Sequence, residues 1–304
     1  MDDQHQLAPL ADFGGAVPPS PPWFRAALAQ APERGNLIVD GSAIELLTWG
    51  AVGKPGLLLL HGNGAHAGWW SFIAPFFASE YRVAALSWSG MGGSAHRDRY
   101  DLSGFVAQLF AASEAAGLFA SAVKPVIVGH SFGGLPMMAA AATAGERIGA
   151  AVIVDSPFRQ MGQGRPPNAT DRPHKVYPTL GEALARFRFA PLQPSPNAYI
   201  VDNIARGSLV EVPGGWQWRF DPYLWGRFEF GTPSDWLSKP TCPVALIWGE
   251  RSAILPPEMV RELRDLLPPD SPAFGIPDAA HHVMVDQPLA FVSALRGLLA
   301  GWPG

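Results

Sequence analysis

The 304-residue chain contains a single cysteine, Cys242. One cysteine cannot form a disulfide within the chain, so the sequence carries no mark of an oxidising compartment. Cys242 is followed by Pro243 and a run of apolar residues. We interpret it as a small buried hydrophobic residue rather than as a nucleophile.

Charge and long hydrophobic runs are also scarce. Only 16% of the residues are charged and the formal net charge is −4, so no basic face for nucleic acid is expected. The longest apolar runs, such as Gly56–Leu60 and Ala150–Val154, are far too short to span a bilayer. The first six residues are polar and acidic, unlike a signal peptide. We therefore expect a soluble, cytoplasmic protein that binds neither nucleic acid nor membranes.

The sequence lacks the motifs of metal and nucleotide sites. It contains no HExxH or CxxC pattern and no P-loop G-x-x-x-x-G-K-[ST]. No Rossmann fingerprint stands between a strand and a helix near the start of the chain. A metal hydrolase needs clustered histidine and carboxylate ligands, whereas His281 and His282 are merely adjacent. We expect no metal ion and no cofactor.

Hydrophobic residues make up 48% of the chain, enough for a large core. Short apolar segments typical of buried strands alternate with helical patterns. The strand-like segments are Asn36–Val39, Ile44–Trp49, Leu57–Leu60, Tyr81–Leu86, Val126–Val128, Ala151–Val154 and Val244–Trp248. The helical segments are Leu102–Ala116, Phe132–Ala144, Pro257–Leu267 and Leu289–Leu299. This alternation predicts an α/β fold with a mainly parallel sheet flanked by helices.

Two stretches break the alternation. Residues 1–35 are rich in proline and indicate an N-terminal arm, with a short helix near Trp23–Gln30. Residues 157–236 hold many prolines and aromatic residues, with helical signals such as Thr179–Phe187 but no alternation. We therefore predict a core made of residues 36–156 and 237–304, with residues 157–236 inserted as a largely helical cap.

Residues Gly129–Gly133 form a G-x-S-x-G motif around Ser131. The motif follows the apolar segment Val126–Val128 and precedes a helix of small residues. A turn that tight between strand and helix needs glycine on both sides and holds the serine in a strained, exposed conformation. The following helix N-terminus favours negative charge beside the serine. The pattern indicates a nucleophilic serine, and an ordinary Gly-Ser turn is the alternative.

With this motif the chain, from about Asn36 to Ala300, resembles the α/β-hydrolase fold family. The segment His61–Gly64 follows a strand and is similar to the family's oxyanion loop. The resemblance implies that the backbone N–H groups of Asn63 and Phe132 surround the substrate's carbonyl oxygen. Each such donor stabilises the transition state by about 3 kcal/mol.

The segment Pro277–His282 resembles the family's histidine loop, in which the catalytic histidine stands seven residues before a proline that opens the last helix. His281 lies seven residues before Pro288 and is the better match, with His282 as its neighbour. The resemblance implies that His281 is the general base for Ser131.

The triad's acid is where the chain departs from the family pattern. The family usually places an aspartate a few residues beyond the glycine that matches Gly249, but Ser252 and Ala253 stand there. Asp155 follows the segment Ala151–Val154, a position from which haloalkane dehalogenases and certain lipases take their acid. We favour Asp155, with Glu250 as the second candidate and the absence of any acid as a third possibility.

The resemblance implies a serine hydrolase that acts on a small molecule. Relatives with dehalogenase or epoxide hydrolase chemistry use an aspartate at the position of Ser131. A carboxylic ester of moderately apolar character, with an acidic end, is our first hypothesis. Thioester, lactone or perhydrolase activity, carbon–carbon bond hydrolysis and a slow-turnover binding protein are the alternatives. The candidates for a substrate pocket, with packing as the other interpretation, are Trp69, Trp70, Trp216 and Trp218.

Overall fold

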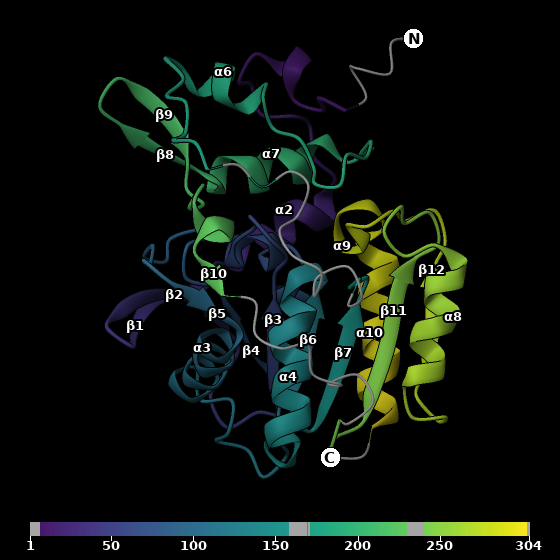
Figure 1. Cartoon of the computed structure of the whole chain (residues 1–304). Helices are drawn as coiled ribbons and strands as arrows, with labels where there is room; N and C mark the ends of the chain where they lie inside the picture. The colour runs from purple at the N-terminus through teal and green to yellow at the C-terminus, as the bar shows by residue number, and fades with distance from the viewer. Residues whose placement is uncertain (1–6, 158–168, 170, 230–239, 303–304) are drawn as a thin grey trace.

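An eight-stranded sheet forms the centre of the protein (Figure 1). The computed structural model describes residues 7–157, 169, 171–229 and 240–302. The strand order is β1-β2-β4-β3-β6-β7-β11-β12. Strands β1 and β2 form an antiparallel hairpin, β2 lies antiparallel to β4, and all further pairs are parallel. The strands are β1 (Glu33–Val39), β2 (Ser42–Trp49), β3 (Gly56–Leu60), β4 (Arg82–Leu86), β6 (Val126–His130), β7 (Ala150–Val154), β11 (Val244–Gly249) and β12 (Ala273–Ile276).

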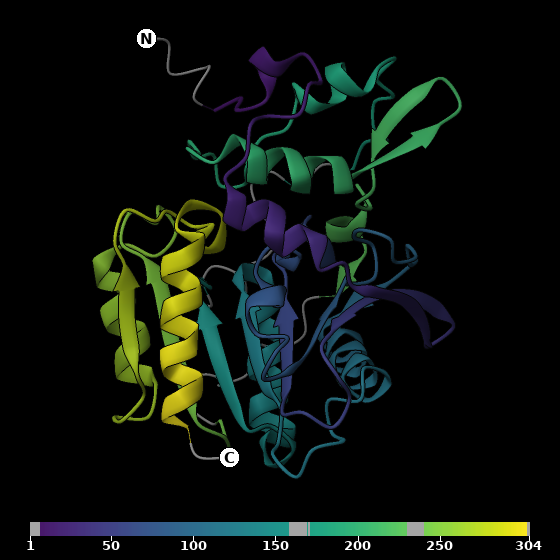
Figure 2. The same cartoon turned by 180° about the vertical axis from the view of Figure 1, so that it is seen from behind.

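Each face of this sheet supports a hydrophobic cluster. Along β3, Leu57 and Leu59 belong to one cluster, whereas Leu58 and Leu60 belong to the other. Successive side chains of a strand point to opposite faces, so a strand covered on both sides must be apolar throughout. Helices α3 (Leu102–Ala115), α4 (Gly134–Ala144) and α8 (Pro257–Leu266) pack on one cluster, and α10 (Pro288–Gly301) packs on the other (Figure 2).

The predicted fold class is confirmed. All seven predicted strands occur, with ends that differ by about three residues at most. Strand β12 (Ala273–Ile276) was not predicted, because it is only four residues long and contains a glycine; it is only partly buried, as suits the edge of a sheet. No helix in the part of the chain that the structure describes combines the length and apolar character needed to cross a membrane.

Above the carboxyl ends of the parallel strands stand the elements that connect β7 to β11 (Figure 1). They include α6 (Leu180–Leu184), α7 (Ala198–Gly207), a hairpin of β8 (Leu209–Val212) and β9 (Gly215–Trp218), and β10 (Phe228–Glu229), which pairs with β5 (Tyr100–Asp101). The hairpin was missed by the sequence analysis, which expected a largely helical cap. The predicted boundary at residues 236–237 lies outside the described residues.

The N-terminal helix α2 (Pro22–Ala29) lies between these cap elements and the core (Figure 2). The ring of Phe24 is centred 5.8 Å from that of Phe72 in the core and 4.9 Å from that of Tyr199 in α7. The guanidinium of Arg206 in α7 donates a hydrogen bond to the carbonyl oxygen of Gly15, at 2.7 Å. The arm therefore joins cap and core.

We expect Phe24→Ala to lower the free energy of unfolding by about 3 kcal/mol, because it leaves a cavity among buried rings. Phe24 is buried, and its contacts come from both cap and core. Urea denaturation measures the change. Arg25→Ala, at an exposed position of the same helix, is the control. An equal decrease of the free energy of unfolding in both variants would show that the ring contacts of Phe24 do not stabilise the fold.

Candidate active site

The turn between β6 and α4 places Ser131 at the carboxyl end of the sheet. Ser131 has a positive φ of 52°, a backbone conformation that residues other than glycine rarely adopt. A Cβ on Gly129 would lie 2.8 Å from the carbonyl oxygen of Gly133, and a Cβ on Gly133 would lie 2.7 Å from a carbonyl oxygen in the loop after β3. Both glycines are therefore required for the close packing that presents the serine.

The structure brings Ser131, His281 and Asp155 together. The hydroxyl of Ser131 lies 3.0 Å from Nε2 of His281, and Nδ1 of His281 lies 2.7 Å from Oδ1 of Asp155. His281 and Asp155 are almost completely buried, with exposed fractions of 1% and 0%. Burial from water strengthens both contacts and fixes the imidazole in one orientation. Glu250, the other candidate acid, is exposed.

Asp155 follows β7 with a positive φ of 45° and is held by further donors. The backbone N–H of Gly249 donates to its Oδ2 at 2.8 Å, and the hydroxyl of Ser252 donates to its Oδ1 at 2.7 Å. Ser252 stands where the family pattern leads one to expect an aspartate. The serine there supports a carboxylate that comes from the neighbouring strand, a role that the sequence analysis missed.

The loop that carries His281 is tied to the cap through Asp286. Oδ2 of Asp286 accepts a hydrogen bond from the backbone N–H of Ala280 at 2.9 Å. The side-chain amide of Gln193, in the cap, donates to both oxygens of Asp286 at 3.0 Å, and its oxygen accepts from the backbone N–H of His282. Burial raises the pKa of Asp286 to about 6. The cap thus helps to fix the position of the histidine loop.

The raised pKa of Asp286 makes stability depend on pH. The pKa in the unfolded chain is lower, near 3.8, so the stabilising contribution is complete below that pH and is lost as the pH rises through 6. We expect wild type to lose about 2 kcal/mol relative to Asp286→Asn between pH 4 and pH 7, since each unit of pKa shift is about 1.4 kcal/mol. Urea unfolding of both proteins at pH 4 and pH 7 measures this loss. If the two proteins differed by the same free energy of unfolding at both pH values, the raised pKa of Asp286 would be contradicted.

Two further histidines surround His281. Nε2 of His130 donates to the carbonyl oxygen of His281 at 3.0 Å. The ring of His282 packs against those of Trp69 and Phe189, with centroid distances of 5.3 Å and 4.6 Å. Burial, with a smaller effect from His281, holds the pKa of both His130 and His282 well below the ordinary value. Both rings are therefore neutral near pH 7.

The segment His61–Gly64 lies against the nucleophile. A Cβ on Gly62 would come within 3.0 Å of the Cβ of Ser131. Both ring nitrogens of His61 bind backbone groups: Nδ1 donates to the carbonyl oxygen of Gly62, and Nε2 accepts from the backbone N–H of Trp88. Burial lowers the pKa of His61 to about 3. Phe132 follows Ser131 in a 3₁₀ turn. The roles of the Asn63 and Phe132 N–H groups as oxyanion donors stay a prediction.

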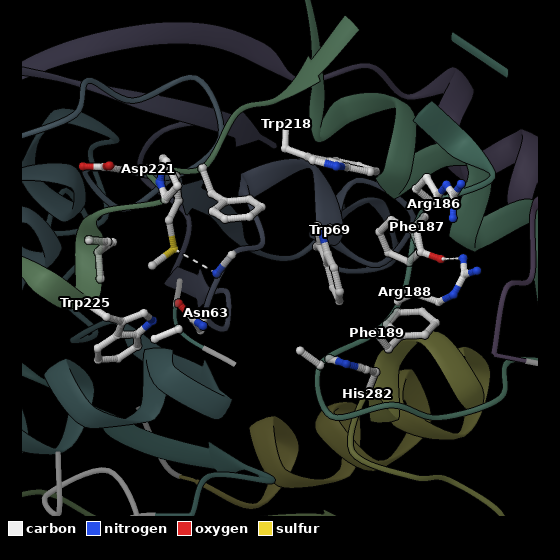
Figure 3. A pocket seen from close by; sticks show the side chains of 17 residues that line it. Asn63, Trp69, Arg186, Phe187, Arg188, Phe189, Trp218, Asp221, Trp225 and His282 are labelled. Atoms are coloured by element: carbon white, nitrogen blue, oxygen red, sulfur yellow. Dashed lines mark hydrogen bonds between the residues drawn. The ribbon is translucent and has the colours of Figure 1, made fainter. Parts of the chain in front are cut away.

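A cavity of about 420 Å³ extends from this loop under the cap (Figure 3). Asn63, which follows the Gly62 that lies against Ser131, and His282, which follows His281 in the sequence, form part of its wall. The remaining wall is largely aromatic, with two arginines from the cap. These further lining residues include Trp69, Met91, Arg186, Phe187, Arg188, Phe189, Trp218, Phe220, Leu224 and Trp225.

Two of the four predicted pocket residues line this cavity. Trp69 and Trp218 do so, in keeping with their predicted place. The other two are not among the residues that line it: Trp70 is buried and packs on Phe291 of α10, and the backbone of Trp216 pairs with that of Tyr177 within the cap. Trp69 and Trp70 are adjacent in a short 3₁₀ helix and point in different directions, so only Trp69 reaches the cavity.

Arg186 and Arg188, two exposed residues of the cap, both border the cavity. They alternate with Phe187 and Phe189, which are buried. This Arg-Phe-Arg-Phe alternation is the signal that could have identified them, because it sends the rings inward and leaves the guanidinium groups beside them at the rim.

The description "Alpha/beta hydrolase family" belongs to the family model that matches residues 57–295. Pimeloyl-[acyl-carrier protein] methyl ester esterase of Chromobacterium violaceum is 27% identical, over 79% of this chain and 92% of that protein. 2-Hydroxy-6-oxo-6-(2'-aminophenyl)hexa-2,4-dienoic acid hydrolase of Metapseudomonas resinovorans is 26% identical, over 82% and 84%. The solved thioesterase domain from the curacin biosynthetic pathway has a TM-score of 0.73 at 22% identity, over 88% of this chain and 99% of that domain. This similarity is one of fold.

Proposed function

The chain belongs to the alpha/beta hydrolase family, and on this premise we propose that it cleaves a small, moderately apolar carboxylic ester through an acyl-enzyme on Ser131. The observation that carries the proposal is the arrangement of three side chains. Nε2 of His281 lies 3.0 Å from the hydroxyl oxygen of Ser131, and its Nδ1 lies 2.7 Å from Oδ1 of buried Asp155. The name of the Chromobacterium relative, a methyl ester esterase, supports an ester as the bond. A cytoplasmic location remains the prediction from the sequence.

In the proposed reaction His281 takes the proton of Ser131 while the hydroxyl oxygen attacks the ester carbonyl. Asp155 accepts the Nδ1–H of His281, which leaves the lone pair of Nε2 facing the serine. The carboxylate also stabilises the imidazolium that forms. The imidazolium then protonates the departing alcohol, and a water activated by His281 releases the acid. Asn63 and Phe132 N–H groups are the proposed oxyanion donors.

The cavity supports a substrate with an apolar body and an acidic end. Its aromatic wall suits apolar groups, whereas Arg186 and Arg188 offer positive charge. Nη1 of Arg188 donates to the carbonyl oxygens of Ala185 and Phe187 at 2.9 Å and 2.7 Å, which fixes the guanidinium beside the cavity. Desolvation, with a contribution from the nearby charge of Arg186, lowers the pKa of Arg188. A substrate carboxylate would relieve that repulsion.

Matched esters test this proposal. We expect faster turnover of an ester with a terminal carboxylate than of its neutral analogue, and Arg188→Gln should reduce that preference by about tenfold, the effect of one charge-assisted hydrogen bond. Arg261→Gln, on helix α8 away from the cavity, is the control. Equal rates on both esters in wild type, Arg188→Gln and Arg261→Gln would refute the proposal that the substrate has an acidic end. No turnover of any ester would refute the ester itself.

Hydrolysis of a carbon–carbon bond in a diketone-like metabolite is the second candidate. The dienoic acid hydrolase relative supports it by name, and the same three residue types serve that reaction. Turnover of diketones without turnover of esters would favour it. The slow-turnover binding alternative relied on a missing acid, and the 2.7 Å contact between His281 and Asp155 removes that ground.

A further inference from the structure

Three buried imidazoles meet beside the nucleophile. His130, His281 and His282, hereafter the histidine triplet, each place one ring nitrogen within 4.8 Å of the others. Their exposed fractions are 1%, 1% and 5%. His130 lies 151 positions before His281 in the chain, so only the fold brings the triplet together. The sequence analysis, which saw two adjacent histidines, predicted no metal ligands.

Hydrogen bonds fix where the lone pairs of two rings lie. Nδ1 of His281 donates to Asp155, so the lone pair of His281 is on Nε2. Nε2 of His130 donates to a carbonyl oxygen, so its lone pair is on Nδ1. Within the described residues, neither ring nitrogen of His282 has a hydrogen-bond partner. Each ring of the triplet therefore has one nitrogen available as a ligand.

The unpartnered ring of His282 is unusual. Buried polar groups are nearly always hydrogen-bonded, and one that is not costs about 1–3 kcal/mol. The rings of Trp69 and Phe189 pack against His282, and the ring centroids of His130 and His281 lie 5.4 Å and 4.7 Å from its own. A bound cation shared by the three rings would offset the cost of its burial.

We propose that the histidine triplet binds a divalent transition metal ion such as Zn²⁺ or Cu²⁺, and that the bound ion inhibits the enzyme. Imidazole nitrogen suits these ions, whereas Mg²⁺ and Ca²⁺ require oxygen ligands that the triplet does not supply. Zinc–nitrogen bonds of about 2.1 Å place three nitrogens about 3.4 Å apart. The nitrogens of the triplet, which lie within 4.8 Å of one another, reach that spacing by a contraction of up to about 1.4 Å, and the ring of His282 has no hydrogen bond of its own to break.

Inhibition rests on the proposed function, since the ion would occupy Nε2 of His281. That lone pair otherwise accepts the proton of Ser131. An imidazole bound to a metal through this nitrogen cannot act as the base, so turnover stops until the ion leaves. No covalent bond forms, and a chelator should restore activity fully. Inhibition and metal binding should therefore follow the same dissociation constant.

Direct binding is the first test. Zinc is titrated into wild type, Ser131→Ala, His282→Phe and the control His96→Asn, an exposed histidine that contacts Arg219, with calorimetry as the readout. Wild type, Ser131→Ala and His96→Asn should each bind one ion equally, and Mg²⁺ should not bind. His282→Phe should weaken binding by at least about tenfold, because it removes one of three nitrogen ligands. His282→Asn serves if the phenylalanine variant does not fold.

Activity is the second test, with every variant compared with its own metal-free rate. Zinc should inhibit wild type and His96→Asn reversibly, and EDTA should restore the rate. At least about tenfold more zinc should be needed for His282→Phe, in line with its weaker binding. Equal zinc affinity in His282→Phe and wild type would overturn the proposal. If Ser131→Ala binds zinc as expected while wild type hydrolyses no ester, the metal site stands and the proposed function fails.

Discussion

Asp155→Asn should lower kcat for ester hydrolysis by about 10⁴-fold, judged from the same replacement in serine proteases. An asparagine amide directed at Nδ1 of His281 favours the tautomer whose proton is on Nε2, so the base can no longer accept the proton of Ser131. The backbone N–H of Gly249, which donates to Oδ2 of Asp155, can still donate to the amide oxygen, and the hydroxyl of Ser252 can accept from the amide N–H, so the substituted side chain would stay in place. The loss would then be of chemistry rather than of fold.

Labelling by a fluorophosphonate probe measures this loss directly, because it reports the reactivity of Ser131 without a chosen substrate. Glu250→Gln is the matched control, since Glu250 is the exposed alternative acid. Fast labelling that is lost only in Asp155→Asn would establish Asp155 as the acid. Slow labelling that neither replacement changes would show a poorly activated serine and would contradict the proposed mechanism.

Ser131→Ala should abolish turnover, with a fall in kcat of about 10⁶-fold as for other nucleophilic serines. The replacement removes only a hydroxyl whose partner is Nε2 of His281. It also leaves both glycines of the turn in place, so melting temperature and circular dichroism should change little.

The matched control is Ser293→Ala, at an exposed position of α10, which should retain the wild-type rate. Near-normal esterase activity in Ser131→Ala would show that the nucleophile is another residue. Both variants lose a hydroxyl that takes part in one hydrogen bond, to the imidazole of His281 at Ser131 and to the carbonyl oxygen of Leu289 at Ser293, so a loss of turnover in Ser131→Ala alone would indicate the contact with the imidazole.

The core was predictable because its signals are local. A strand buried on both faces must be apolar at every position, which Leu57–Leu60 shows directly in the sequence. The glycines around Ser131 follow from the space available in one turn, again a property of neighbouring residues. Such features depend on a few consecutive residues, and the structure reproduces them.

Contacts between distant segments were harder to predict. Asp155 and Glu250 were both candidates from the sequence, and only the parallel pairing of β7 with β11 decided which carboxylate reaches His281. The support from Ser252 depends on the same pairing. The choice between Trp69 and Trp70 depends on the direction of one short turn, which no apolar pattern specifies.

The arm that joins cap and core has a consequence for how such proteins diversify. Tyr199 in α7 packs on Phe24, and Gly15 accepts a hydrogen bond from Arg206. The side of the cap that faces the core is therefore completed by residues of the N-terminal arm. A chimera that received this cap without residues 7–30 would expose Tyr199 and its neighbours to solvent. Selection on substrate preference should therefore act on the arm and the cap as one inherited pair, although Phe24 lies 174 positions before Ala198, the start of α7.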